Sequence, residues 1–542
     1  MNMMKKNIKY ISILLAASVL SLTGCDIDPE LTNSYPEDVA WSNETNLRLT
    51  INGFYPLLGG YYGSELSDDA YADLLKMNGT NDNQNLFVFG SAPITPQANP
   101  WNNWANRHAW QISCCRFLRD LEIHKENFSE EAALEAEAEI RFFRAWIDFD
   151  LAKRFGGQFV LYKELPELGQ KEHPLCAPEE SWDLIAEDLD FAAQHLPDKN
   201  MVPAGRLTKG AAWGLKARAM LYAKRWKEAA AAAEEVGKLG YELYKNPGRA
   251  DKGYGELFMS RRSAPVVNNE VIIEVGHSYA DKFDYSFDYF YCPKSDGGYA
   301  QVSPTETLVS QYEMADGREF DWNDPEMAAD PYTGREPRFY ATILYNGCTW
   351  KGQKLYTYVG AETGDGYAVG GGTTCTGYYM RKLFDEQLPK NGMRSTDLTY
   401  YPMRYAEILL IYAEAMAEMG NLSKAVGALN QVRARVDLPG YPTSLSKGAF
   451  DKALRHERMV ELAFEGHRFW DVRRWGLGTT LFNNIQVKGV KPTKNEDGTF
   501  SYQVVSCDGS KKRIYHEKYN RFPIPQIELQ QNVAIEQFDE WK

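Results

Sequence analysis

Two stretches of the chain, residues 205–241 and 403–439, constrain the fold most, because each predicts two helices joined by a short turn. In the first stretch, small residues recur where two antiparallel helices would meet, so that the backbones can approach closely: Ala211, Ala212, Gly214 and Ala217. In the second stretch, Gly420 breaks the helical pattern, and we expect Ser423 to cap the helix that follows. The spacing therefore predicts a scaffold of helical hairpins.

A third helical segment covers residues 129–157, with Ser129 as the expected N-cap and Gly156 as the expected stop. The two hairpins have the small residues and short turns of tetratricopeptide hairpins. They are not tandem, because Tyr222 and Tyr412 stand in like positions far apart in the chain. We expect a mainly α fold, in which a tetratricopeptide-like helical hairpin scaffold carries a loop-rich, β-containing ligand-binding part.

Most of that ligand-binding part is expected in an insertion at residues 246–400. The stretch "NNEVIIEV" reads as a short strand, and residues 352–377 are glycine-rich and predict loops. Aromatic residues alternate through residues 283–291, which predicts an extended segment with one aromatic face. A second irregular stretch covers residues 56–107. Loops on a rigid scaffold are the usual place for binding residues.

The N-terminus has the pattern of an export signal. Lys5, Lys6 and Lys9 precede a ten-residue apolar run that is too short to span a bilayer comfortably. The run ends in Leu22-Thr23-Gly24-Cys25, which resembles a bacterial lipobox, so Cys25 is the expected lipidation site. The alternative is an ordinary secretory signal with a chance cysteine.

The chain therefore divides into four expected parts. Residues 1–24 form the signal peptide, and residues 25–40 form the lipid anchor and an acidic, proline-bearing tether. An N-terminal part at residues 41–245 holds helical pairs and the loop at 56–107. A C-terminal part at residues 246–542 holds the insertion and the helical pairs of residues 401–542.

Composition narrows the classes of molecule that the protein is expected to bind. The formal net charge is -14, and removal of the signal peptide would remove three lysines and no acid. Such a chain repels phosphate backbones, which argues against a nucleic-acid partner. Seven cysteines remain besides Cys25, without a C-x-x-C pair or zinc-like spacing. A bridge between Cys348 and Cys375 is conceivable, but nothing in the sequence supports it.

Several motifs carry a family resemblance. The chain has "AEIRFFRAWIDFDLAKRFGG", "GRLTKGAAWGLKARAMLYAKRWKEA", "RYAEILLIYAEAMAEMGN", "HERMVELAFEGHRFWDVRRWG" and "RFPIPQIELQQN" in this order, after the lipobox. Together they resemble the SusD/RagB family of outer-membrane lipoproteins over essentially the whole chain. One departure is Cys114-Cys115, which replaces an alanine- or cysteine-asparagine pair that is usual in the family.

The resemblance implies a function. It implies a non-catalytic lipoprotein that faces the cell exterior, needs no cofactor and binds an oligosaccharide. It also implies that the protein delivers this ligand to a SusC-like TonB-dependent transporter in the outer membrane. The alternatives are an oligopeptide ligand, as in the RagB branch, a surface glycosidase, or a purely structural partner of the transporter.

Aromatic and amide side chains are the candidate ligand contacts, because sugars stack on flat rings and hydrogen-bond to amides. The stretch "NPWNNWANRH" supplies Trp101, Asn102, Trp104 and Asn106, of which the family resemblance favours Trp101 and Asn106. The alternating segment and its surroundings supply five more: Tyr285, Tyr289, Tyr291, Tyr299 and Trp350. Each of these rings could instead fill the core.

A metal site is not expected. His456-Glu457 begins like H-E-x-x-H, but position 460 is valine. The nearby charged residues instead predict a buried ion-pair network: Glu461, Glu465, Arg468, Asp471 and Arg473.

Overall fold

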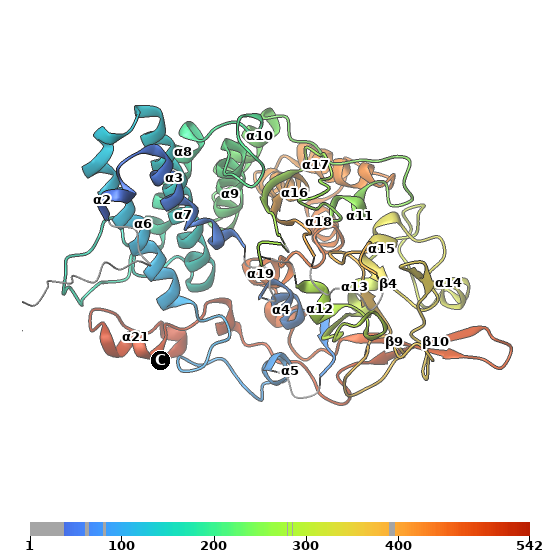
Figure 1. Ribbon diagram of the computed structural model, residues 1–542. Coiled ribbons are helices and arrows are strands. Elements are labelled where there is room, and N and C mark those ends of the chain that lie inside the picture. Colours follow the sequence, from blue (N-terminus) through green and yellow to red (C-terminus); the bar gives the residue numbers. More distant parts are fainter. Residues whose placement is uncertain (1–36, 60–63, 80–82, 279, 284–285, 390–395) are drawn as a thin grey trace, which may run out of the picture.

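The computed structural model describes residues 37–59, 64–79, 83–278, 280–283, 286–389 and 396–542 (Figure 1). Cys25, the predicted lipidation site, and Tyr285 lie outside these residues. Among the described residues, no helix combines the length and the apolar character that crossing a bilayer requires.

Helices packed side by side form one half of the molecule. Each helix packs against the next in the order α6, α7, α8, α9, α10, α16, and α16 then contacts both α17 and α18. Their bounds are α6 Trp104–His124, α7 Glu130–Phe155, α8 Pro178–His195, α9 Lys209–Tyr222, α10 Trp226–Lys238, α16 Tyr405–Glu418, α17 Leu422–Arg435 and α18 Lys447–Glu461. The two predicted hairpins, α9–α10 and α16–α17, are therefore neighbours in space, although the insertion separates them in sequence (Figure 1).

Local sequence sets the ends of these helices. The Ser129 side chain accepts a hydrogen bond from the Ala132 amide at the start of α7, and Gly156 ends the helix with a φ of 66°, as predicted. The predicted cap of α17 was wrong. The Asn421 side chain, not that of Ser423, accepts from the Lys424 amide, because the helix begins two residues earlier than the pattern suggested.

The small residues of the first hairpin are needed for close packing. A Cβ atom on Gly210 would lie 2.4 Å from the Tyr241 ring, and one on Gly214 would lie 2.4 Å from the Met403 sulfur. Both glycines therefore pack against residues outside the two hairpin helices, while α9 and α10 themselves pack side by side.

The rest of the chain forms a second core with little regular structure. Its strands occur as five antiparallel pairs: β1 (Leu75–Met77) with β3 (Val302–Pro304), β2 (Val271–Val275) with β8 (Tyr400–Arg404), β4 (Ile343–Leu344) with β7 (Tyr379–Met380), β5 (Thr349–Trp350) with β6 (Gln353–Lys354), and β9 (Lys488–Lys494) with β10 (Phe500–Ser506). The predicted strand at "NNEVIIEV" is β2, and its partner β8 lies at the C-terminal end of the insertion. The β9–β10 hairpin projects from the body (Figure 1).

Short helices complete the described chain. They are α2 (Glu37–Ala40), α3 (Glu44–Asn52), α4 (Ser64–Tyr71), α5 (Asn83–Val88), α11 (Tyr254–Leu257), α12 (Phe287–Tyr291), α13 (Glu306–Val309), α14 (Pro325–Ala329), α15 (Pro337–Thr342), α19 (Arg468–Arg474), α20 (Gly478–Leu481) and α21 (Gln526–Gln531).

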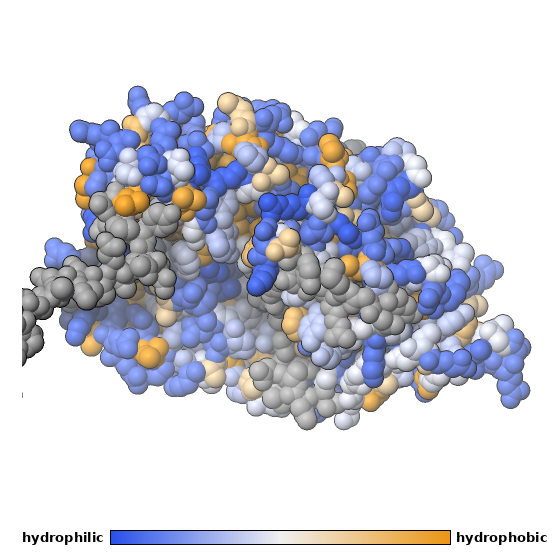
Figure 2. Space-filling view, in the orientation of Figure 1, coloured by the Kyte–Doolittle hydropathy of each residue, from blue (hydrophilic) through white to orange (hydrophobic). Residues whose placement is uncertain are grey.

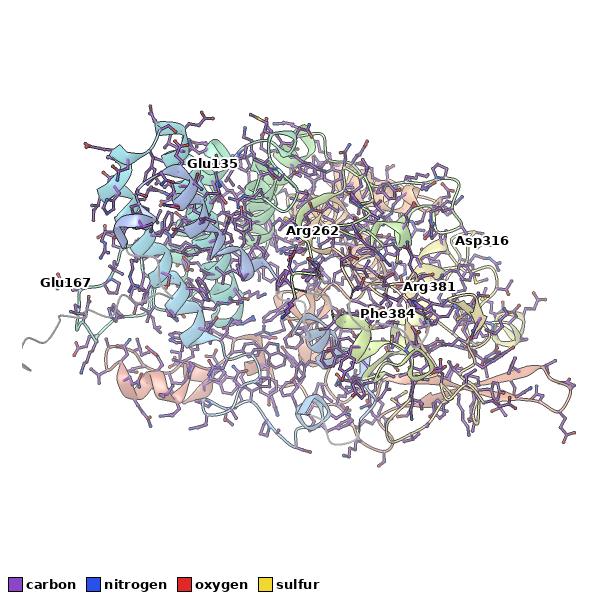
Figure 3. The ribbon with its side chains drawn as sticks, in the orientation of Figure 1. Glu135, Glu167, Arg262, Asp316, Arg381 and Phe384 are labelled. Atoms are coloured by element: carbon purple, nitrogen blue, oxygen red, sulfur yellow. The ribbon has the colours of Figure 1, made fainter. Side chains whose placement is uncertain are left out.

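The predicted extended segment at 283–291 is wrong over its second half, because residues 287–291 form the helix α12. Phe287 and Tyr291 are four residues apart, and their ring centroids lie 4.8 Å apart on one buried face. Phe287 also packs against Phe384, which Figure 3 labels, at 5.5 Å. An alternating pattern contains the i,i+4 spacing of a helix, so a short aromatic run fits either structure.

The predicted ion-pair network is present and joins the two halves. Arg404 pairs with Glu461 at 2.6 Å and Glu465 at 2.7 Å, and Arg458 pairs with Asp471 at 2.7 Å. Arg468 pairs with Asp73 instead. Arg473 is the exception in the predicted set, because its guanidinium donates to the backbone carbonyls of residues 519 and 520.

The seven described cysteines are all free thiols, including Cys348 and Cys375. The Cys375 carbonyl instead accepts a hydrogen bond from the Cys507 thiol at 3.2 Å. Cys114 and Cys115 are both buried in α6.

Candidate functional site

A cleft of about 460 Å³ lies where the helical half meets α4 and α19. We define the cleft by the residues that line it, which include Trp101, Asn102, Asn103, Arg107, Trp146, Asp150, Lys153, Arg154, Arg218, Tyr222, Tyr400, His467 and Trp470. Two predicted ligand contacts, Trp101 and Asn102, therefore lie at the cleft.

Trp101 reaches the cleft with little of its ring free. Phe469 stacks on the ring at 4.7 Å and Phe522 at 5.0 Å, each nearly parallel to it. The indole N–H donates to Asp68 Oδ1 at 2.6 Å, and only 6% of the residue is exposed. Because side chains from the C-terminal part cover the ring, Trp101 is a core residue at the edge of the cleft.

The other predicted residues of this stretch divide between core and surface. Trp104 is 2% exposed and packs edge-on against Phe155, so its ring offers no platform to a ligand. Asn102 and Asn106 are both exposed. Asn102 lines the cleft, and its side-chain oxygen accepts from the Trp104 amide at 3.3 Å. Asn106 does not line the cleft.

Tyr289 and Tyr299 form an exposed aromatic pair, which we call the tyrosine pair. The ring centroids lie 4.9 Å apart with the planes nearly perpendicular, and the hydroxyls lie 3.0 Å apart. Tyr299 is 54% exposed and Tyr289 is half-buried. The Tyr299 amide donates to the Tyr289 carbonyl at 3.1 Å, so the backbone fixes the pair.

Two other predicted rings of the insertion are in the core. Tyr291 is 8% exposed on the inner face of α12. Trp350 is 2% exposed, and its indole N–H donates to Asp296 Oδ2 at 3.3 Å. Alternating aromatics in the sequence gave no sign of which rings would face outward.

Two exposed residues close in sequence to the tyrosine pair, Lys294 and Phe283, were not among the predicted ligand contacts. Lys294 is exposed, and it lies near the glycine turn at 370–372, where a Cβ on Gly372 would be 3.9 Å from the lysine Nζ. Phe283 is 45% exposed and stacks on His277 at 5.1 Å. The face of the molecule drawn in Figure 2 is mostly hydrophilic where it is coloured, with scattered apolar residues.

One segment connects the cleft to the tyrosine pair. Tyr71, at the end of α4, lies at the cleft, and β1 follows it. β1 pairs with β3, a strand that begins three residues after Tyr299. The Asn78 side chain, just after β1, donates to the Ala300 carbonyl at 2.5 Å. The two features therefore lie at opposite ends of residues 71–78.

The cleft is strongly cationic around one carboxylate. Arg107 Nε lies 2.7 Å from Asp150, Lys153 Nζ 3.0 Å and Arg154 Nη1 3.1 Å. Burial opposes the ionisation of Asp150, but the three cations outweigh burial and hold its pKa well below the ordinary value. Sequence analysis missed this cluster, although Asp150, Lys153 and Arg154 stand at i, i+3 and i+4 of the predicted helix.

The remaining ionisable groups of the cleft are neutral or paired elsewhere. Burial lowers the pKa of His467 to about 4, so the imidazole is uncharged at neutral pH. Arg218 pairs with Glu407 at 2.5 Å, outside the cationic cluster. Asp68 accepts from the indoles of Trp101 and Trp470, and burial raises its pKa.

The residues of the incomplete H-E-x-x-H motif make other contacts in the structure. Within the described ranges, no group of three or more His, Cys, Asp or Glu side chains is placed to hold a metal ion. His456 hydrogen-bonds to the Gln311 carbonyl at 2.7 Å, and Glu457 pairs with Arg338 and Arg433. Both residues of the incomplete motif are thus engaged in the core.

Comparison with known proteins identifies the fold and the family. A model of the SusD family matches residues 269–541. The chain belongs to the SusD family. A curated relative, SusD-like protein P2 of Formosa agariphila, is 25% identical over 526 residues, which are 91% of this chain and 95% of the relative.

Solved structures of SusD-like proteins share the whole fold. A SusD-like protein of Bacteroides fragilis superposes with a TM-score of 0.78 at 27% identity, over 93% of this chain and 99% of its own. A SusD-like carbohydrate binding protein of the same organism gives a TM-score of 0.75 at 24% identity, over 92% and 99%. The mainly helical fold and the family membership inferred from the motifs are confirmed.

Proposed function

We propose that this SusD-family protein binds an oligosaccharide at the cell surface, with the tyrosine pair as its main platform. The observation that carries the proposal is the exposed, rigid geometry of Tyr289 and Tyr299, whose rings stand perpendicular at 4.9 Å. A sugar ring presents C–H groups that pack on an exposed aromatic face and hydroxyls that bond to the phenol oxygens. The similarity to a carbohydrate-binding family member supports this ligand class.

The role of the protein follows from the family and the N-terminal sequence. Residues 1–24 would be removed as a signal peptide, and Cys25 would carry the lipid that holds the protein to the outer membrane, facing outward. Captured glycan would pass to a SusC-like TonB-dependent transporter beneath the protein. Residues 25–40 would serve as the tether that leaves the body free to tilt over the transporter.

No catalytic step is part of the proposal. Hydrolysis of a glycosidic bond requires one carboxyl group as acid and another as base or nucleophile. In the cleft, three cations hold Asp150 and two indoles hold Asp68, so both carboxylates are already engaged. Binding followed by release suffices for capture and delivery.

Affinity gel electrophoresis of residues 26–542 through a panel of polysaccharides tests the proposal. We expect one glycan to retard the protein, and Tyr299→Ala to weaken retardation at least tenfold. Tyr412→Ala is the matched control, because Tyr412 is a half-buried tyrosine on the helical scaffold. Retention that is equal in both variants would refute the tyrosine platform.

The same experiment separates the alternatives. Degradation of any glycan by the pure protein would establish a glycosidase. Binding of peptides with no glycan retained would place the protein with the peptide-binding branch. Transporter binding without any ligand would leave only a structural role.

A further inference from the structure

The cleft contains more positive charge than its own acids neutralise. The lining has four cations, Arg107, Lys153, Arg154 and Arg218, against the three carboxylates of Asp68, Asp150 and Glu465. Arg107, Lys153 and Arg154 surround Asp150, and Lys153 and Arg154 also attract Asp68. Burial also lowers the pKa of Lys153, despite the attraction of Asp150, which shows that water solvates this ammonium poorly. Buried charge without a counter-ion is unfavourable, so a cleft of this kind favours an anion.

Hydrogen-bond donors and acceptors in the cleft also lack partners. Arg154 Nε and Nη1 are buried, and neither makes a hydrogen bond to any residue that the structure describes. Arg154 Nη1 is near Asp150, but it is not aligned to donate to it. Asn103 Oδ1 is likewise buried and without a donor in the described chain. The Arg154 and Asn103 side chains both contact Asp150. An unsatisfied guanidinium and an unsatisfied amide oxygen around one carboxylate suit a ligand that has both an anionic group and hydroxyls.

We propose that the cleft binds the carboxylate of a uronic acid residue in an acidic oligosaccharide. This inference rests on the proposed function, since it names the class of glycan that the protein takes. The ligand carboxylate would accept hydrogen bonds from Arg154 and Lys153, and a ring hydroxyl would donate to Asn103 Oδ1. The volume of about 460 Å³ is within the range of cavities that hold small ligands.

The geometry favours a carboxylate over a neutral sugar. A guanidinium binds a planar carboxylate with paired hydrogen bonds. Two of the cleft's rings are covered, because Lys153 and Arg154 lie over the Trp470 ring at 4.6 and 5.0 Å and Phe469 and Phe522 stack on Trp101. Trp146, Tyr222 and Tyr400 are half-buried at the cleft and could contact the faces of the same sugar. The tyrosine pair would also hold sugar faces, while the cleft would select for charge.

Calorimetry with matched ligands tests the inference. Oligogalacturonides and alginate oligomers would be compared with the same oligomers after reduction of their carboxyl groups to alcohols. We expect at least tenfold tighter binding of an acidic oligomer than of its reduced counterpart. We also expect sodium glucuronate to raise the unfolding temperature more than sodium chloride of equal ionic strength.

Variants locate the site. Arg154→Gln should weaken the acidic ligand at least tenfold, and the fold should survive because two cations remain on Asp150. Asn102→Asp should weaken it as well, since it adds a negative charge at the cleft and its Oδ1 can still accept from the Trp104 amide. Lys424→Gln is the control, because Lys424 is an exposed cation on α17, outside the cleft.

The outcomes separate this inference from the proposed function. Equal binding of acidic and reduced oligomers, or acidic binding unchanged in Arg154→Gln, would overturn the inference and leave glycan binding standing. Failure of every acidic oligomer, with a neutral glycan retained, would do the same. Binding of no glycan at all would overturn both. Peptide binding that Arg154→Gln abolishes would assign the cleft to a peptide carboxylate and refute the uronate.

Discussion

Replacement of Trp101 by alanine tests whether this ring belongs to the core or serves as a ligand platform. The Trp101 ring is stacked on Phe469 and Phe522, and the residue is 6% exposed. Removal of a buried tryptophan side chain costs about 3–5 kcal/mol. Asp68 would also lose one of its two indole donors, which adds about 1–3 kcal/mol at a buried acceptor. We therefore expect Trp101→Ala to lower the free energy of unfolding by roughly 4 kcal/mol or more.

Urea unfolding followed by circular dichroism measures this loss. Trp101→Phe should retain the ring stacking but not the hydrogen bond, and should cost about 1–3 kcal/mol. Tyr299→Ala is the opposite control, because an exposed ring should change stability by less than about 0.5 kcal/mol while it weakens glycan retention. If Trp101→Ala unfolds at the wild-type urea concentration but no longer binds glycan, the assignment of this ring to the core is wrong.

Three further changes test the packing and the charges. Gly210→Ala should destabilise by about 1–3 kcal/mol in a thermal melt, because its Cβ would lie 2.4 Å from the Tyr241 ring; wild-type stability would show that the ring can move. Arg404→Met should cost about 3–5 kcal/mol in urea, since it leaves Glu461 and Glu465 short of a buried partner; a neutral effect would mean that the network is dispensable. Burial raises the pKa of Asp288 to about 7, so its contribution to stability is greatest below the unfolded pKa near 4 and is lost as pH rises through 7. Asp288→Asn should therefore gain stability relative to wild type between pH 5 and pH 8, by at most about 4 kcal/mol, and a difference that is the same at both pH values would contradict the shift.

The sequence predicted features that local interactions determine. The ends of α7 follow from Ser129 and Gly156, and the helical pairs α9–α10 and α16–α17 follow from their periodic patterns. The predicted cap of α17 was wrong by two residues, Ser423 instead of Asn421, because asparagine and serine both cap helices.

The sequence could not show which aromatic rings are exposed. The Trp101 ring stacks on Phe469 and Phe522, which lie far along the chain, so this contact depends on the completed fold. In the same way, Tyr291 is buried and Tyr299 is exposed, although both belong to one tyrosine-rich stretch of sequence. Burial of a ring is a tertiary property, and no local pattern determines it.

The excess charge of the cleft persists after local compensation is taken into account. Lys153 and Arg154 lie in the last turn of α7, where the helix dipole supplies about half a negative charge. The Trp470 ring, covered by both cations, adds about 0.5–2 kcal/mol of cation–π attraction without neutralising them. These effects explain why the fold tolerates three cations around Asp150 in the absence of a ligand. Asp68 is a second acid of the cleft and attracts both Lys153 and Arg154, so the remaining excess of positive charge is small. None of these effects supplies a hydrogen-bond acceptor for the unpartnered Arg154 donors, and a bound carboxylate would.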